Sequence, residues 1–263
     1  MIIFSFISRW VRPCIESLPI PKIFVYIFPF GLTREDETYE RKEKAMYFRH
    51  NLTTFLETSW IKTLYFNLRY FGWKGFSLPV IVGKKFKLKK MKGTVILPES
   101  FPKKIFLGRD DFGWMRSHGY WCNEGTVIFE GPCFIGNGTR LTVSQEGTLT
   151  MGGNLYFSGN ALVICRHAIR LGGDSMISWN VTIMDSDLHA ITDRESRTVN
   201  SPKAVLLGKH TWIGFESRLL KGCQLPDGCI VAAGSTVSKA FDRENLLIGK
   251  VNEILKNKVE WDA

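Results

Sequence analysis

Aliphatic residues return at every sixth position near the C-terminal end of the chain. The run comprises Leu207, Ile213, Leu219, Leu225, Val231 and Val237, and the small residues Thr211, Ser217, Cys223, Cys229 and Ser235 follow the first five at the fourth position. A period of six fits neither the 3.6-residue period of a helix nor the alternation of a strand in a flat sheet. It predicts a solenoid of short straight segments joined by tight corners, with one residue in six filling a narrow core.

The same period occurs earlier in the chain, interrupted by shifts of phase. The earlier runs are Phe129, Ile135 and Leu141; then Met151, Phe157, Val163 and Ile169; and then Ile177 and Ile183. Such shifts are typical of loops inserted at the corners of a continuous solenoid, because extra residues there leave the stacked core undisturbed. We therefore predict a solenoid over residues 93–241, with an excursion loop at about 190–206.

The two flanks of the solenoid have different patterns. Residues 1–92 predict a separate N-terminal region with a helix from Glu35 to about Tyr70, followed by short strands at Pro79–Val82 and Phe86–Leu88. Residues 242–263 place apolar pairs among charges, which favours a helix that caps the open end of the solenoid. The predicted fold is mainly β, with a helical and mixed N-terminal region and a C-terminal helix.

Composition excludes several classes of protein. The chain has six cysteines but no CxxC pair, and Cys133, Cys223 and Cys229 fall at the small inward position of the repeat, so we expect reduced core residues rather than a disulfide framework. The apolar stretches at residues 2–7 and 23–30 are shorter than the roughly 18 residues of a membrane span. No basic leader or small-residue cleavage site accompanies them, so we expect a cytoplasmic protein.

The net charge of +10 is confined to the N-terminal third. Residues 1–92 hold 17 Lys and Arg against 7 Asp and Glu, whereas residues 93–263 hold 18 of each. The excess peaks in a segment where lysines alternate with Phe86 and Leu88: Lys84, Lys85, Lys87, Lys89, Lys90 and Lys92. Two interpretations stay open: an edge strand that lysine protects from unwanted pairing, or a surface that contacts phosphates of anionic lipid or of a pyrophosphate-linked glycan. Nucleic acid is not expected, because no recognised binding motif accompanies the lysines.

The chemically richest segment ends one run of the repeat. His189, preceded by Asp185 and Asp187, stands at the root of the predicted excursion loop. An imidazole can take a proton from a hydroxyl at neutral pH if a carboxylate or carbonyl holds its other nitrogen. A surface histidine beside two solvated aspartates is the competing interpretation.

Residues 208–239 resemble the C-terminal coils of the hexapeptide-repeat acyltransferases. The resemblance rests on Gly-Lys-His-Thr-Trp-Ile-Gly from Gly208 and on Val-Ala-Ala-Gly-Ser-Thr-Val-Ser-Lys ending at Lys239. Residues 177–189 are similar to the segment that carries the active histidine, especially in bacterial polysaccharide O-acetyltransferases, and the match extends over about 127–250. The resemblance implies a left-handed parallel β-helix and a homotrimer with active sites between subunits. It also implies direct transfer of an acetyl group from acetyl-CoA to a sugar hydroxyl of a capsule, lipopolysaccharide or related glycan.

Individual roles follow from the same resemblance. His189 would be the general base and Asp187 or Asp185 would orient its ring. The backbone N–H of Phe215, after Trp212 and Gly214, would stabilise the thioester oxygen. Further contacts implied are Ala233 with the pantetheine arm, Ser238 and Lys239 with the far end of CoA, and Trp179 and Asn180 with the acceptor. Trp212 could equally pack at a corner, Lys239 could be an ordinary exposed lysine, and Asn180 could join an asparagine ladder inside the coils.

Two other classes of protein compete with a transferase. A zinc enzyme of the γ-carbonic anhydrase type needs three histidines on one metal, but His167 and His210 lie far from His189 in the sequence and across shifts of phase, so we expect no metal site. We expect structural roles for both histidines, with His167 facing inward. A non-catalytic solenoid for assembly or membrane recruitment would not bind acetyl-CoA.

Overall fold

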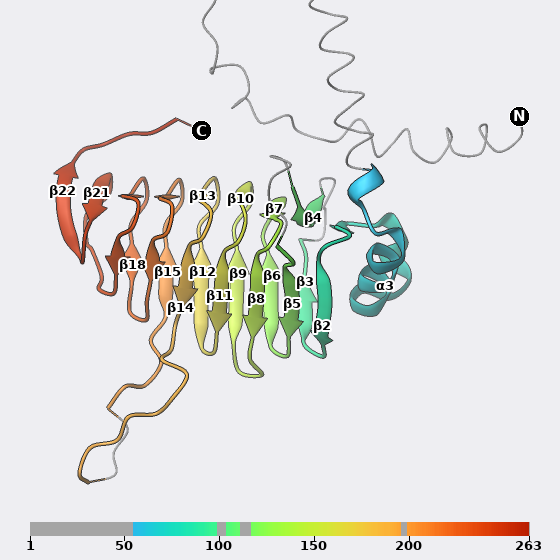
Figure 1. The fold of residues 1–263 in the computed structure, drawn as a ribbon, viewed down its shortest axis with the longest axis horizontal. Coiled ribbons are helices and arrows are strands. Elements are labelled where there is room, and N and C mark those ends of the chain that lie inside the picture. Colours follow the sequence, from blue (N-terminus) through green and yellow to red (C-terminus); the bar gives the residue numbers. More distant parts are fainter. Residues whose placement is uncertain (1–54, 99–103, 111–116, 196–198, 263) are drawn as a thin grey trace, which may run out of the picture. The chain divides into compact units, whose positions relative to one another are not determined.

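The computed structural model describes residues 55–98, 104–110, 117–195 and 199–262. The chain divides into two units, residues 1–58 with Ala263 and residues 59–262, and every element named below belongs to the second unit (Figure 1). This unit begins with helix α3 (Trp60–Phe71) and the 3-10 helix η2 (Gly72–Ser77). Strands β1 to β22 follow, and they make up the rest of its regular structure.

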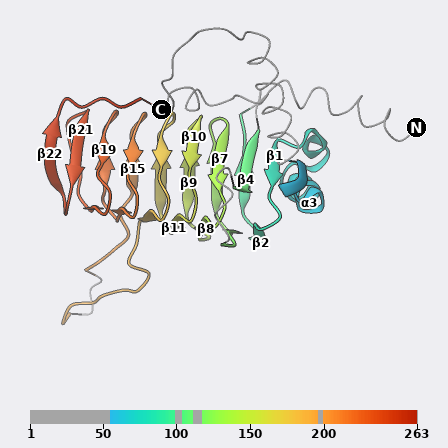
Figure 2. The same ribbon diagram turned by 45° about the horizontal axis from the view of Figure 1, so that its top comes forward.

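The strands form three sheets that run along the solenoid (Figures 1 and 2). Sheet 1 contains β1 (Val80–Val82), β4 (Ile105–Arg109), β7 (Cys133–Gly136), β10 (Leu155–Phe157), β13 (Met176–Ile177), β16 (Trp212–Ile213), β19 (Ile230–Val231), β21 (Leu246–Gly249) and β22 (Glu253–Asn257). Sheet 2 contains β2 (Lys87–Met91), β5 (Tyr120–Asn123), β8 (Arg140–Val143), β11 (Leu162–Cys165), β14 (Thr182–Met184), β17 (Arg218–Leu219) and β20 (Thr236–Val237). Sheet 3 contains β3 (Thr94–Ile96), β6 (Thr126–Phe129), β9 (Thr148–Met151), β12 (Ala168–Leu171), β15 (Val205–Leu207) and β18 (Gln224–Leu225).

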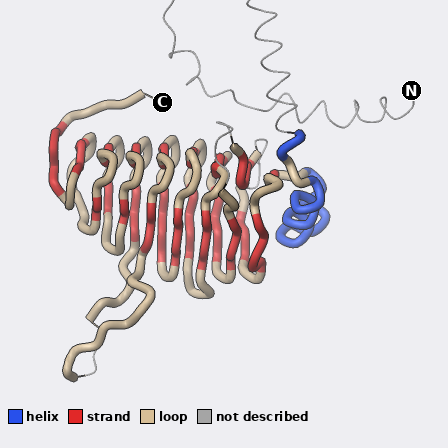
Figure 3. The backbone as a smooth tube through the Cα atoms, in the orientation of Figure 1, coloured by secondary structure: helices blue, strands red, loops and turns tan. Residues whose placement is uncertain are grey.

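Each of the first six coils contributes one strand to each sheet, and all pairings between the strands except β21 with β22 are parallel. The tube drawing shows the resulting short red strands separated by tan corners (Figure 3). The fold is therefore the mainly β, left-handed parallel β-helix that the resemblance predicts.

The six-residue period becomes a stack of side chains inside the coils. The register pairs Ile213 with Val231 and Leu219 with Val237, so one coil holds three hexads. Leu207 and Leu225 stack in the same way in sheet 3. All these side chains are at most 3% exposed, because the inward position of each short strand must fill a narrow interior.

The corners leave little space for side chains, as the small residues of the repeat predict. Thr211, Ser217 and Ser235 are buried, and a Cβ built on Gly214 would lie 2.6 Å from the carbonyl oxygen of Val231 in the next coil. Cys223 is also buried with a free thiol, and burial raises its pKa to about 12. The predicted reduced core role of the inward cysteines is confirmed for Cys133, Cys223 and Cys229.

The boundaries of the solenoid differ from the prediction at both ends. The coils begin at Val80 rather than near residue 93, since β1, β2 and β3 already pair with the next coil. The predicted C-terminal helix is wrong, because residues 246–257 form β21 and β22. Leu246 and Ile248 alternate inward along β21 and extend the buried stack, which outweighs the helix-like spacing of the apolar pairs.

Helix α3 covers the first coil. Phe66 and Tyr70 pack against Trp121 of β5, with ring centroids 5.2 and 6.3 Å away. The side-chain amide of Asn67 forms the two hydrogen bonds that a neighbouring strand would form with β1: its NH₂ donates to the carbonyl of Val80, and its oxygen accepts from the Val80 N–H. Of the helix predicted over Glu35 to Tyr70, the described part is helical at residues 55–57 and again from Trp60 onward. Residues 35–54 and the apolar stretches at 2–7 and 23–30 lie outside the described residues. Within the described ranges, no helix is long and apolar enough to cross a membrane.

Candidate active site

The predicted excursion lies between β14 and β15, at the corner that joins sheets 2 and 3 (Figure 1). Ile177 pairs with Ile213 of the next coil, and Ile213 pairs with Val231 of the coil after that. The first pair is separated by twice as many residues as the second, so the excursion doubles the length of its coil. Corners between sheets 2 and 3 are here called second corners; residues 185–204, 220–223 and 238–241 form three successive ones. First corners join sheets 1 and 2, and they comprise residues 178–181, 214–217 and 232–235.

Asp185 anchors the start of the excursion to the preceding coil. Its carboxylate is fully buried and accepts hydrogen bonds from the backbone N–H groups of Arg166 (2.8 Å) and His167 (2.7 Å). Its own carbonyl accepts from the N–H of Lys203, where the excursion returns. The buried carboxylate is therefore used to hold two backbone N–H groups of the preceding coil, and it does not contact the ring of His189 within one chain.

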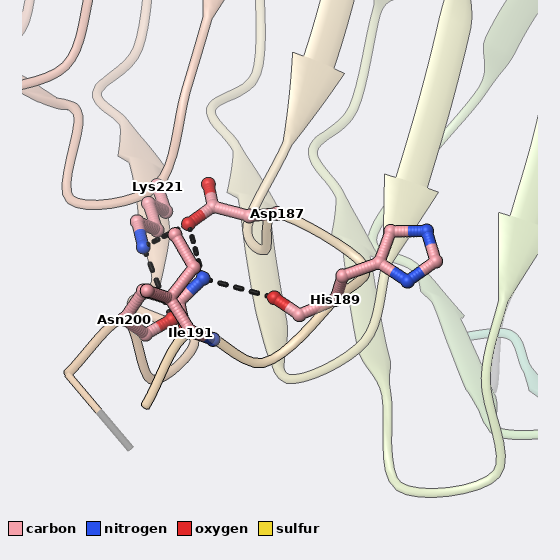
Figure 4. A network of polar contacts seen from close by, with 5 residues as sticks. All are labelled: Asp187, His189, Ile191, Asn200 and Lys221. Carbon is pink, nitrogen blue, oxygen red and sulfur yellow. Dashed lines mark hydrogen bonds and ion pairs between the residues drawn. The ribbon is translucent and has the colours of Figure 1, made fainter. Parts of the chain in front are cut away.

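Asp187, Asn200 and Lys221 form a second set of contacts, here called the clasp (Figure 4). Lys221 makes an ion pair with the Asp187 carboxylate and donates to the carbonyl of Asn200 at 3.0 Å. The Asn200 side-chain NH₂ donates to Asp187 Oδ2 and to the carbonyl of His189, both at 2.9 Å, while its Oδ1 accepts from the N–H of Ile191 at 2.7 Å. The clasp thereby ties the outgoing and returning arms of the excursion to the next coil.

The clasp also stabilises the ionised form of Asp187. The hydrogen bond from Lys221, and then that from Asn200, lower the pKa of this carboxyl below its ordinary value of 3.8. The carboxylate is occupied by Lys221 and Asn200.

His189 is exposed, and its ring points away from the clasp (Figure 4). In the described part of the chain, only its backbone carbonyl has a hydrogen-bond partner, which is Asn200. Neither predicted aspartate contacts the imidazole within one chain, because Asp185 is satisfied by backbone N–H groups and Asp187 by an ammonium and an amide. The orienting roles of Asp187 and Asp185 stay predictions.

A pocket of about 810 Å³ opens beside the clasp on three successive second corners. Its polar lining comes mainly from Asp187, Ser238 and three lysines: Lys203, Lys221 and Lys239. The lysines are one coil apart along the chain and occupy the same position of successive coils, so we call them the lysine ladder. With one carboxylate against three ammonium groups, the pocket is positive. His189 does not line it, although Asp187 two residues earlier does.

Several other predicted residues lie on the first corners instead. Trp179 and Phe215 contact each other with ring centroids 5.7 Å apart, while Gly214 and Ala233 lie on the same corners of their coils. Asn180 is exposed with φ 61°, so it does not belong to a ladder inside the coils. Trp212, at the end of the adjoining strand, donates from Nε1 to Ser178 Oγ at 3.2 Å and packs on Trp261.

One chain does not bring the two groups of residues together. A strand of sheet 2 separates each first corner from the second corner of the same coil. The stretch from Asn180 to Asp185 spans roughly 16 Å at about 3.3 Å per residue. The side of sheet 2 at which its strands end therefore carries His189, Ser238 and Lys239. The opposite side, at which its strands begin, carries Trp179, Phe215 and Ala233.

The remaining histidines have separate surroundings. His167 is exposed, contrary to the prediction, because Cys165 and Ile169 take the neighbouring inward positions. His210 stacks on Trp261 at 4.4 Å and exchanges hydrogen bonds with its backbone and indole, so it holds the C-terminal segment to the coils. No group of three or more His, Cys, Asp or Glu side chains that could hold a metal occurs among the residues that the structure describes.

Sequence reasoning missed Asn200, Lys203 and Lys221. The two lysines could have been found from the three-hexad repeat of the coil, which relates both to Lys239. Asn200 carries no comparable signal, since its contacts with residues 11 and 13 positions away depend on how the excursion closes.

Comparisons with known proteins agree with the architecture. No protein-family model matches the chain. The chain is 23% identical over 148 residues to WbbJ of Escherichia coli K12, a proposed lipopolysaccharide biosynthesis O-acetyl transferase, covering 52% of this chain and 74% of WbbJ. It is 24% identical over 185 residues to an uncharacterised 24.8 kDa protein in the cps region of Klebsiella pneumoniae, covering 69% and 81% of the two chains.

Among solved structures, the polysialic acid-specific acetyltransferase NeuO aligns with a TM-score of 0.46 at 19% identity, over 68% of this chain and 89% of NeuO. The six-residue repeat and the three-sheet coils are those of a hexapeptide-repeat β-helix, and the sequence relatives include a proposed O-acetyl transferase.

Proposed function

We propose that the chain is an acetyl-CoA-dependent O-acetyltransferase that modifies a sugar hydroxyl of a capsule, lipopolysaccharide or related glycan. The observation that carries this proposal is the presentation of His189. The clasp holds the backbone of His189, and the ring is exposed without a partner in the described chain. A positive pocket lies on the same side of the solenoid, at the ends of the sheet 2 strands. The names of WbbJ and of the protein in the Klebsiella cps region support a glycan as the acceptor.

In the proposed reaction, a ring nitrogen of His189 takes the proton of the acceptor hydroxyl. The hydroxyl oxygen then attacks the carbonyl carbon of the acetyl thioester, and the bond from that carbon to sulfur breaks. The thiolate of CoA leaves and receives the proton from the imidazolium. The backbone N–H of Phe215 is proposed to stabilise the negative charge that develops on the thioester oxygen, because a fixed donor needs no reorganisation during the reaction.

The proposed catalyst is a homotrimer with its sites between subunits. The base lies on a second corner and the proposed Phe215 donor on a first corner, so a second copy is needed to bring the two kinds of corner together. A head-to-tail contact between different surfaces closes into a ring, and three copies then make three equivalent sites. Trp179 and Asn180 would contact the acceptor from the first corner, where the absence of a side chain at Gly214 lets the backbone pack closely on Val231 and Ala233 of the next coil.

The lysine ladder supports an anionic ligand along the second corners. Parallel neighbours in a sheet are about 4.8 Å apart, so ladder positions recur at about that interval along the solenoid axis. Phosphates of CoA are the proposed ligand for Lys239 and Ser238. Asn252 holds Ser238 in place by accepting from its N–H at 2.8 Å and contacting its hydroxyl at 3.1 Å. We propose that the reaction takes place in the cytoplasm.

The proposal is tested by incubating the protein with acetyl-CoA and a panel of free, nucleotide-linked and lipid-linked sugars while measuring release of free thiol. We expect His189→Ala to lower acceptor-dependent release by about 10²–10⁴-fold, the usual contribution of a general base. His167→Ala is the matched control, since His167 is also an exposed histidine near the second corner of the preceding coil.

Full activity of His189→Ala would contradict the assignment of the base. Failure of the wild-type chain to bind acetyl-CoA would favour a non-catalytic assembly module, and stoichiometric zinc with carbonate chemistry would favour a zinc enzyme.

A further inference from the structure

Helix α3 is apolar on its outer face as well as on the face that covers the first coil. Thr63, Phe66 and Asn67 are buried against the coil. The outer face carries Trp60, Ile61, Leu64 and Tyr65, which are 45%, 85%, 41% and 56% exposed. These four lie at spacings of one, three and four, so they form one continuous stripe along the helix.

The 3-10 helix η2, which follows α3 directly, carries two further exposed aromatic side chains. Trp73 is 86% exposed and Phe76 is 56% exposed, and their rings contact each other at 5.6 Å. Isolated exposed apolar residues are ordinary on a protein surface, but six large ones on two consecutive helices mark an interaction surface. We call these six residues the α3–η2 face: Trp60, Ile61, Leu64, Tyr65, Trp73 and Phe76.

A dense positive charge adjoins this face. Residues 55–92 contain nine Lys and Arg and a single acid, Glu57. Lys62 of α3 donates to the carbonyls of Lys84 (2.8 Å) and Phe86 (3.0 Å), which fixes the basic turn against the helix. Burial, and then the charge of Lys87, lower the pKa of Lys62.

Most lysines of the basic segment lack an acidic partner. Lys90 pairs with Glu124 at 2.9 Å, and Lys89 lies over the ring of Tyr120. Across the described residues, Lys84, Lys85, Lys87 and Lys92 have no ion pair and are exposed. Strand β2 is the edge of sheet 2, so its lysines do discourage pairing with another strand. Edge protection explains no part of the apolar α3–η2 face, which lies on helices.

We propose that the α3–η2 face and the lysines of residues 84–92 form a docking surface for an anionic membrane. Indole and phenol rings favour the boundary between headgroups and acyl chains, and neighbouring lysines favour anionic headgroups. Charge complementarity selects this occupant over the chain's own residues 1–54. Those residues carry eight Lys and Arg against six Asp and Glu, so they could cover apolar surface but not neutralise the lysines. This inference is independent of the proposed reaction.

Binding of the full chain to vesicles tests the electrostatic part. We expect sedimentation with vesicles that mix phosphatidylcholine with anionic phosphatidylglycerol, weak sedimentation with phosphatidylcholine alone, and release by high salt. The variant Lys84→Gln/Lys85→Gln/Lys87→Gln should bind at least about tenfold more weakly. Its control is Lys209→Gln/Lys256→Gln/Lys258→Gln, which has the same net charge but changes exposed lysines at the other end of the solenoid.

A second pair of variants tests the apolar part. Ile61→Ser/Trp73→Ser should fold normally, since both side chains are highly exposed, and should lose most of the vesicle binding. Val251→Ser/Leu206→Ser, which removes exposed apolar residues elsewhere, should bind as the wild type does.

Three results would overturn the inference. They are an equal loss in both lysine variants, unchanged binding in both docking-surface variants, and protection of the Ile61 and Trp73 side chains from hydroxyl-radical labelling in the full chain without vesicles. The first would mean non-specific charge, the second another membrane-binding segment, and the third coverage by this chain or a partner.

Discussion

At the scale of single residues, the structure separates three neighbours that look alike in the sequence. Asp185 is a buried anchor, Asp187 is an exposed member of the clasp, and His189 extends from a backbone that the clasp holds. Because the pKa of Asp187 lies below 3.8, the ion pair with Lys221 is formed at and above the ordinary titration range of a carboxyl. It is lost only as the pH falls through the lowered pKa. The clasp is therefore constant over the neutral range in which imidazoles titrate.

Asn200 is predicted to be a positioning residue for His189. Asn200→Ala removes the donor that joins Asp187 to the His189 carbonyl and the acceptor for Ile191. Small misplacement of a catalytic group is costly, so we expect kcat to fall by about 10- to 100-fold with little change in the KM for acetyl-CoA. Steady-state kinetics of acetyl transfer measures both parameters.

Asn154→Ala is the matched control, because Asn154 donates an exposed hydrogen bond to Asp174 at 2.8 Å on a different corner. A merely structural role for Asn200 would lower the melting temperature of its variant while leaving the kcat of the folded fraction unchanged.

At the scale of the elements, the coil is defined by which side of each short strand faces inward. Strand β17 contributes Leu219 to the stack and exposes Arg218, and strand β15 contributes Val205 and Leu207 while exposing Leu206. The sequence period identified Leu207 and Leu219 as inward residues because each hexad distinguishes core from corner without reference to distant residues. The same reasoning misassigned residues 242–263, where the apolar residues suit a helix locally but the open edge of sheet 1 offers β21 a strand partner.

Two leucines on neighbouring coils provide a direct test of this inward and outward assignment. Leu219→Ala should lower the free energy of unfolding by about 2–5 kcal/mol, because Leu219 is fully buried and the coil cannot collapse around the cavity. Leu206→Ala, at a side chain 37% exposed, should cost no more than about 0.5 kcal/mol. Denaturant unfolding of both variants makes the comparison, and equal losses would contradict the assignment.

At the scale of the whole molecule, the residues of the candidate site lie at opposite ends of the strands of sheet 2. A solenoid cannot fold one end of these strands onto the other, since its stacked strands and buried core make it rigid across the sheet. A site between subunits therefore stays our proposal, in which a second copy supplies the corner that one chain cannot bring to His189.

Mixed trimers are predicted to recover activity from two inactive variants. His189→Ala lacks the base, and Phe215→Pro lacks the proposed backbone donor on the other corner. If each site combines one corner from each of two subunits, random trimers from equal amounts should show about a quarter of wild-type activity. Co-refolding of the two variants followed by the thiol-release assay makes the measurement.

Light scattering should give the mass of a trimer for each variant and for the mixture. A mixture as inactive as its components, with both variants trimeric and exchanging subunits, would show that a site does not combine these two corners.

The sequence by itself determined the β-helix, its inward residues, its reduced core cysteines and the position of the excursion that carries His189. These features depend on a period of six and on small corner residues, which are local properties of the chain. Only the tertiary structure decided the partners of the two aspartates, because Asn200 and Lys221 reach Asp187 across 13 and 34 positions through closure of the excursion. It also decided the strand at the C-terminal end and the exposed face of α3, since an apolar stripe on a helix does not reveal which side will be covered.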